Sequence, residues 1–294
     1  MIFLKKFLYT ALLLAVSCVF CFGCAKKESK NDSESTIQAT SQPFTEREVA
    51  DTTGTFVFDK AGILSADDLK ACNNYAGWLY NEKLINAAVI TVSNLDGKTP
   101  YDYAAEEFGK IYEGKGSGLV ILINNETDED VIYKTGACFS VIDQKTQDDA
   151  LFWATKDFVA KDYRKGIMRL LQLGEVCPSH IIDNAQVFEY DRVAALEKAL
   201  ASCKSDVTLL ATLNGSSVKN EDILKDYYKR RYSSGNGIML MIDTKSGSMI
   251  AYSDEKLSSG LEAALKDAGA LTAKKDYFGA VNKIIEVLDG KTES

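Results

Sequence analysis

The sequence predicts an α/β fold with two tandem α/β/α sandwich domains, each containing a small open sheet flanked by helices. Short apolar strands alternate with segments whose apolar residues recur at helical spacing. The order of these segments is then repeated in the second half of the chain. Between the halves, Pro178 interrupts any continuous helix. We therefore expect domains at residues 51–175 and 184–290.

The first 24 residues have the pattern of an export signal. Lys5 and Lys6 precede an apolar run of about 16 residues, which is short for a membrane span of roughly 20. The end of this run resembles a bacterial lipoprotein signal, in which the lipidated cysteine becomes the first mature residue. Cys24 fits that position because the small Gly23 precedes it and a polar segment follows. We predict lipid attachment at Cys24 and removal of the residues before it.

Two alternatives to Cys24 stay open. Cys18 follows the small-residue pattern Ala15-Val16-Ser17, but it would leave an apolar mature terminus. The segment could also remain as an uncleaved anchor. A metal cluster on the closely spaced cysteines is the weakest reading, because cluster sites need a fourth thiolate and a polar loop. Residues 25–50 are rich in polar side chains and predict a flexible tether.

The elements of the first domain follow from residue 55 onward. "TFVFD" predicts a strand, and Ser65 begins a helix with Asp68 as its capping partner. "NAAVITVSNL" predicts a buried strand, and Thr99-Pro100 opens the next helix, since Pro is tolerated in the first turn. "GLVILIN" and "DVIYKTG" predict two further strands. A single long helix is expected from about residue 146 to 173.

The second half repeats these segments in the same order. "VTLLATLNG" corresponds to "AAVITVSNL", and "GNGIMLMID" corresponds to "GSGLVILIN", with Gly237 standing 119 positions after Gly118. "SMIAYSD" corresponds to "DVIYKTG", and both halves close on Lys-Asp-Tyr, an apolar helix and Gly. This agreement predicts a duplication. The link at 175–186 should then be exposed and open to proteolysis, unless the two sheets pack together through an apolar face.

The first half resembles the TPM domain family, named for a thylakoid lumen protein, a photosystem repair protein and a receptor-modulating protein. The resemblance spans about residues 55–173 and rests on "VFDKAGILSADD", "GSGLVILIN" and "FVAKDYRKGI". The second half resembles the family more weakly, since "VFEYDRVAAL" lacks Ala-Gly-x-Leu-Ser. The resemblance implies an α/β/α sandwich outside the cytoplasm, often tethered to a membrane. Some members are said to bind calcium or cleave phosphate esters.

The family's chemical residues are only partly present. The family's Asp-Asn-Gly triplet appears as Gly116-Ser117-Gly118 and Gly235-Asn236-Gly237, without the Asp. A hard cation needs several converging carboxylate or carbonyl oxygens. Asp59 and Asp143 are candidates for a pocket at the strand ends, although each could instead cap a local turn or helix. We therefore predict no catalytic or metal-binding residues, with calcium as the cofactor that the resemblance allows.

Composition restricts the remaining function classes. The net charge of −8 argues against a nucleic-acid partner, which needs clustered Lys and Arg. His180 is the only histidine, which leaves little for a Ser–His triad or a His-rich metal site. The cysteines after the signal, Cys72, Cys138, Cys177 and Cys203, could pair in an exported chain. Two of them continue apolar helical faces, which favours buried thiols, and no pairing follows from the sequence.

Two functions remain. One is a lipid-anchored binding or scaffold protein of the cell envelope, on the periplasmic face or the cell surface. Its partners would be the membrane, through the lipid, and another envelope protein. The alternative is a weak phosphatase-like or calcium-binding protein that uses Asp59, acting as a phosphate-ester hydrolase. The missing carboxylates favour the first.

Overall fold

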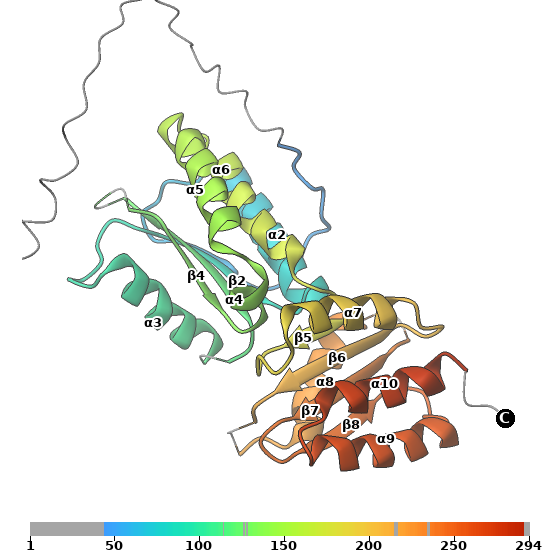
Figure 1. Ribbon diagram of the computed structural model, residues 1–294. Helices are drawn as coiled ribbons and strands as arrows, with labels where there is room; N and C mark the ends of the chain where they lie inside the picture. The colour runs from blue at the N-terminus through green and yellow to red at the C-terminus, as the bar shows by residue number, and fades with distance from the viewer. Residues whose placement is uncertain are drawn as a thin grey trace, which may run out of the picture. The chain divides into compact units, whose positions relative to one another are not determined.

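The computed structural model describes residues 44–290, except 114, 126, 128, 215, 216, 234 and 235. Within this range lie two four-stranded sheets, ordered β1-β2-β3-β4 and β5-β6-β7-β8. In each sheet the first three strands are parallel, and the fourth is antiparallel to the third. Helices flank both sheets (Figure 1). The predicted fold class, two sandwich-like α/β domains, is therefore confirmed.

The first domain buries both faces of its sheet. Helix α3 covers one face, where it packs on Ala88, Ile90 and Leu122. Helices α2, α5 and α6 cover the other face, which includes Val89 and Ile121. Its elements are β1 (Val57–Asp59), α2 (Ala66–Glu82), β2 (Asn86–Val92), α3 (Pro100–Tyr112), β3 (Gly118–Asn124), β4 (Val131–Thr135), α4 (Ala137–Val141), α5 (Gln144–Val159), α6 (Tyr163–Leu171) and the 3-10 helix η1 (Gln172–Val176).

The second domain follows the same plan. Helix α8 packs on the face that carries Leu210 and Met241, and α7, α9 and α10 pack on the face that carries Leu209 and Leu240. Its elements are β5 (Ile181–Asp183), α7 (Tyr190–Ala201), β6 (Val207–Thr212), α8 (Asn220–Arg231), β7 (Ile238–Asp243), β8 (Ser248–Tyr252), α9 (Ser259–Thr272) and α10 (Tyr277–Leu288). The strands predicted from residue 207 onward are confirmed.

The predicted helix starts at Ser65 and Thr99 are confirmed. The Ser65 hydroxyl accepts a hydrogen bond from the Asp68 N–H at 3.2 Å, and Thr99 caps Asp102 in the same way at 3.1 Å. Each hydroxyl also donates to the aspartate carboxylate, at 2.7 Å in both cases. These contacts satisfy N–H groups that have no partner inside the helix.

The single helix expected over 146–173 is wrong. Helix α5 ends at Val159, Lys161 has a φ of 61°, and Asp162 caps the new helix α6 by accepting from the Lys165 N–H at 3.2 Å. A left-handed residue cannot continue a helix, so the chain turns there. The second domain repeats the break, with Lys275 at a φ of 65° and Asp276 as the cap of α10. The shared Lys-Asp-Tyr segment therefore marks a turn between two helices.

The link between the domains is partly buried, whereas an exposed link was expected. Cys177 is 2% exposed and Ile181 is 1% exposed, and the latter begins β5, three residues before the expected start of the second domain at 184. The described residues also form one compact unit within residues 43–294. Arg231 of α8 pairs with Glu82 of α2 at 2.9 Å. The two halves thus make direct contact.

The link is held by Glu197 of α7, which gives a pH-dependent prediction. Its carboxylate accepts from the backbone N–H groups of Ser179 and His180 at 2.9 and 2.8 Å, and the His180 ring lies 3.1 Å away. Burial acts to raise the pKa of Glu197, but these hydrogen bonds outweigh it and hold the pKa below the ordinary value of 4.5. A lowered carboxylate pKa stabilises the fold above that ordinary value, and the stabilisation is lost as the pH falls through the folded value.

We expect Glu197→Gln to lower the free energy of unfolding by about 1–2 kcal/mol at pH 7. We expect a smaller loss at pH 3.5, because the stabilisation by a carboxylate with a lowered pKa decreases as the pH falls below 4.5. Urea unfolding at both pH values measures the difference. Glu189→Gln is the control, because Glu189 precedes the same helix but makes no side-chain cap. An equal cost of Glu197→Gln at both pH values would contradict the assignment.

Candidate functional site

Asp59 ends β1, and its carboxylate is engaged by the turn that follows. Its Oδ1 accepts from the Ile63 N–H at 3.1 Å, and its Oδ2 accepts from the Leu64 N–H at 3.0 Å. The Thr91 hydroxyl of β2 also donates to Oδ1. The Thr91 oxygen in turn accepts from the Ala61 N–H at 3.1 Å. Both carboxylate oxygens therefore hold the backbone of this turn.

Asp183 has the same place in the second domain. Its Oδ1 accepts from the Val187 N–H at 3.1 Å, and its Oδ2 accepts from the Phe188 N–H at 2.9 Å. Gln186 has a φ of 53°, as Gly62 has a φ of 64° in the first domain. Burial raises the pKa of Asp183 above its ordinary value, against the effect of these hydrogen bonds. The two turns are built in the same way.

This geometry corrects the alignment of the second half. The counterpart of Val57–Leu64 is Ile181–Phe188, not the segment that begins at Val187. "IIDNAQVF" keeps the aspartate and the alanine of "VFDKAGIL" and replaces the glycine with glutamine. The repeated aspartate and alanine could have been recognised in the sequence. The start of the second domain was instead expected at residue 184, because Pro178 was taken to mark a link.

Asp143 caps helix α5. Its Oδ1 accepts from the Thr146 N–H at 2.8 Å, and its Oδ2 accepts from the Thr146 hydroxyl at 3.0 Å. The Thr146 backbone hydrogen bond is the main cause that lowers the pKa of Asp143. Asp143 follows β4 and Asp59 ends β1, and these strands are the opposite edges of the sheet. The structure does not bring the two candidate residues together.

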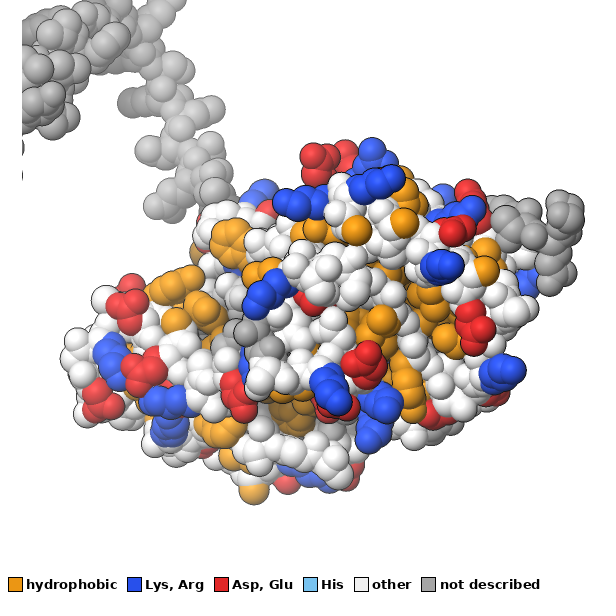
Figure 2. All heavy atoms as spheres, turned by 90° about the horizontal axis from the view of Figure 1, so that it is seen from below, with side chains coloured by type: hydrophobic (Ala, Val, Ile, Leu, Met, Phe, Trp, Pro, Cys, Tyr) orange, Lys and Arg blue, Asp and Glu red, His pale blue; other side chains and the backbone are white. Residues whose placement is uncertain are grey.

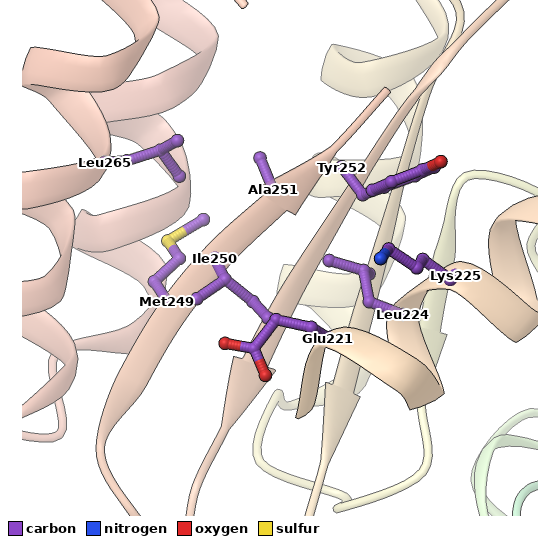
Figure 3. Close-up of a pocket in the computed structure, with 8 residues that line it drawn as sticks. All are labelled: Glu221, Leu224, Lys225, Met249, Ile250, Ala251, Tyr252 and Leu265. Atoms are coloured by element: carbon purple, nitrogen blue, oxygen red, sulfur yellow. The ribbon is translucent and has the colours of Figure 1, made fainter. Parts of the chain in front are cut away.

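A hollow of about 360 Å³ lies beside β8 in the second domain (Figure 3). Helix α8 and helix α9 stand on either side of the strand in this view. The hollow is lined by Glu221, Leu224 and Lys225 of α8, by Met249, Ile250, Ala251 and Tyr252 of β8, and by Leu265 of α9. We call these eight residues the β8 groove.

The β8 groove lies along the edge of the sheet. Successive residues of a strand point to opposite faces, and Met249 to Tyr252 all line the hollow. A space bordered by both faces of one strand must reach across its edge. In the described part of the chain, β8 pairs with β7 and is the last strand of its sheet. Backbone groups at such an edge are available to another strand.

The first domain fills the equivalent place with an aromatic side chain. Tyr133 of β4 pairs with β3 as Tyr252 pairs with β7. Tyr101, the second residue of α3, packs edge-on against Tyr133 with ring centroids 5.3 Å apart. The second residue of α8 is Glu221, and the Lys225 amine lies 5.6 Å from the Tyr252 ring centroid. Glu221 thus lines the β8 groove at the position where the first domain has the aromatic residue Tyr101.

A family model described as the TPM domain matches residues 57–173. The match begins with β1 and ends inside η1, so it contains the whole first sheet and its helices. Residues 57–173 are similar to the TPM domain over this whole span. The resemblance seen in the sequence is thereby confirmed for this segment.

Two solved structures, both solution NMR structures of N-terminal domains, resemble this chain. The domain from P. gingivalis is 16% identical, with a TM-score of 0.37; the alignment covers 42% of this chain and 81% of that one. The domain from Corynebacterium glutamicum is 19% identical, with a TM-score of 0.35; the alignment covers 46% of this chain and 90% of that one. No curated protein matches the sequence.

In the first domain, a small group of polar side chains near the end of β1 forms hydrogen bonds and ion pairs with one another. The Lys60 amine donates to Glu107 at 2.6 Å and to the Tyr103 hydroxyl at 3.1 Å. The second Glu107 oxygen accepts from Lys110 at 2.8 Å. Across the described residues, no group of three or more His, Cys, Asp or Glu side chains is arranged to hold a metal ion. Calcium, the cofactor that the family resemblance allows, is not tested by this observation.

The N-terminal predictions lie outside the described residues, including lipid attachment at Cys24 or Cys18. Within the described range, no helix has the length and hydropathy of a membrane span. Sequence reasoning missed the β8 groove, because it depends on how α8 and α9 pack around β8. The available signal was small: Glu221 replaces an aromatic residue when the halves are aligned by their helix starts.

Proposed function

We propose that this chain is a lipid-anchored binding protein of the cell envelope, held on the extracytoplasmic side. In this proposal the second domain is a second, divergent TPM-like copy, and its β8 groove docks an extended segment of another envelope protein. The single observation that carries the docking proposal is the hollow that spans both faces of the edge strand β8.

The chemistry of the β8 groove selects the kind of partner. An extended peptide can pair its backbone with a free strand edge while its alternate side chains enter pockets on either face. Leu224 and Ile250 offer apolar contact on one face, and Met249 and Leu265 offer it on the other. Glu221 and Lys225 add one charge of each sign. We therefore expect an extended partner segment with apolar side chains and little net charge.

The charge distribution supports a protein partner over a nucleic acid. On the face shown in Figure 2, Lys and Arg alternate with Asp and Glu among hydrophobic side chains. Nucleic-acid binding relies on clustered cations that neutralise phosphates, and the chain carries a net charge of −8.

Photo-crosslinking in cells tests the docking proposal. A photoreactive residue at Lys225, which lines the β8 groove, should capture an envelope protein, whereas one at the exposed Lys229 should not. Glu221→Tyr should fill the groove as Tyr101 covers the first sheet, and should reduce the captured adduct about tenfold or more. Asp222→Tyr is the matched control, since Asp222 is exposed in the same helical turn and makes the same charge change. Equal capture by both variants would contradict the proposal.

The enzymatic alternative has its own matched pair of variants. Asp59→Ala and Asp183→Ala remove the same kind of turn, one in each domain. Turnover of a generic phosphate ester that is lost only in Asp59→Ala would support hydrolysis by the TPM domain. Saturable micromolar calcium binding by calorimetry would support the calcium alternative. We expect neither, because the Asp59 oxygens are engaged by the turn.

A further inference from the structure

Two buried cysteines meet where the first domain passes into the link. Cys138 lies in the short helix α4, and Cys177 follows η1. Their Sγ atoms are 3.6 Å apart, and the residues are 0% and 2% exposed. A disulfide requires a sulfur–sulfur separation of about 2.05 Å, and these two sulfur atoms are already in contact.

The other described cysteines are placed elsewhere. Cys72 lies in α2 and belongs to the same core, and Cys203 follows α7 in the second domain, where its sulfur contacts the Ala199 carbonyl at 3.5 Å. The sulfur–sulfur contact therefore singles out Cys138 and Cys177. We propose that these two residues form a disulfide bond in the mature protein.

The bond would reinforce contacts that already hold the link. The Lys83 amine donates to the Cys177 carbonyl at 2.9 Å. On the other side, the Gly136 carbonyl, two residues before Cys138, accepts from the Gln186 side chain at 3.1 Å. A covalent bond here would fasten the turn between β4 and α4 to the segment that leads into β5. It would also close a loop whose ends are 39 residues apart.

The reaction balances with an external disulfide as oxidant. The two thiols lose two electrons and two protons as the S–S bond forms, and glutathione disulfide accepts them to become two glutathione thiols. Such oxidants persist outside the cytoplasm, so formation in the cell rests on the proposed extracytoplasmic location. The contact with Cys177 and burial together raise the pKa of Cys138, which suppresses the reactive thiolate in the folded chain. The bond should therefore form during folding, before the thiols are buried.

Refolding the reduced full-length chain in a glutathione redox buffer tests the pairing without reference to location. Peptide mapping without reductant should recover a Cys138–Cys177 cross-linked peptide, lighter by about 2 Da than the two reduced peptides together. Reduction should lower the melting temperature of this product by about 5–15 °C. Cys138→Ala/Cys177→Ala should show no response to reductant. Cys72→Ala/Cys203→Ala should respond as the wild type does.

The possible results separate the pairing from the location. Quantitative alkylation of Cys138 and Cys177 in the refolded chain, or a peptide that joins either to another cysteine, would overturn the pairing. A cross-linked peptide in the refolded chain, together with free thiols in chain isolated from cells under acid trapping, would uphold the pairing and contradict the proposed location.

Discussion

Replacing Asp157 with Ala should lower the free energy of unfolding by about 3–5 kcal/mol. Asp157 of α5 accepts from the Arg169 Nε of α6 at 2.6 Å, and their side chains are only 11% and 7% exposed. The Arg169 guanidinium also lies 4.9 Å from the Phe44 ring centroid. Removing the carboxylate breaks the ion pair between Asp157 and the Arg169 guanidinium, which is largely buried. Urea or thermal unfolding measures the effect.

The second domain places an apolar residue at the position of Asp157 and Lys283 at the position of Arg169. The Asp276 N–H bonds the Leu271 carbonyl as the Asp162 N–H bonds the Asp157 carbonyl, so Leu271 stands in the place of Asp157. The double variant Asp157→Leu/Arg169→Leu should therefore recover much of the lost stability, because well-packed apolar residues can replace a buried ion pair. Lys165→Ala removes the more exposed partner of Asp157 and should cost less than about 1 kcal/mol. A cost of Asp157→Ala no larger than that of Lys165→Ala would contradict the argument.

The described strands other than β5 were predicted from the sequence, because strand burial follows from local composition. The short strand β5 (Ile181–Asp183) lies in the segment that was expected to be a link. "NAAVITV" and "GLVILIN" are apolar except for Asn86, Thr91 and Asn124, and every residue of β2 and β3 is buried. Two interior parallel strands covered on both faces need this composition. The polar turn at residues 125–130 predicted a hairpin between β3 and β4, and the antiparallel pairing of these strands confirms it. A turn this short leaves no room for a crossover.

The predictions that were wrong concern residues whose type fits two different local structures. The Lys-Asp-Tyr segment was read as the interior of a long helix, but Asp162 is the cap of a new one. Pro178 was read as the centre of an exposed link, but Cys177 and Ile181 on either side of it are buried. A capping aspartate and an interior aspartate look alike until the φ of the preceding residue is known. The site predictions had the same ambiguity, since Asp59 and Asp143 each satisfy nearby backbone N–H groups.

The β8 groove and the Cys138–Cys177 contact could not be predicted from the sequence. Each depends on distances between segments that are far apart along the chain. Cys138 and Cys177 are 39 residues apart and meet because α5 and α6 form a hairpin that returns the chain to α4. The β8 groove depends on how α8 and α9 pack around β8, and no local residue pattern predicts that packing.

Cys24→Ser should abolish incorporation of a fatty-acid analogue into this protein in cells. Lipidation of a lipoprotein signal occurs on the thiol, so a serine hydroxyl at that position cannot replace it. A fatty acyl chain contributes about 0.8 kcal/mol per buried CH₂, so a lipid at Cys24 would supply membrane affinity that the variant lacks. The variant should therefore also move from the membrane fraction to the soluble fraction or remain as unprocessed precursor, as gel mobility would show.

Cys18→Ser provides the matched control for that experiment, because it changes the same chemistry six residues earlier. If Cys24 carries the lipid, Cys18→Ser should keep the full label and membrane location. Label retained in Cys24→Ser and lost in Cys18→Ser would move the attachment to Cys18 and leave "VFCFG" in the mature chain. Label retained in both variants and in the pair combined would contradict lipidation at either cysteine. The segment predicted to be a tether, residues 25–50, would then carry no lipid at its start, and the anchoring proposal would be contradicted.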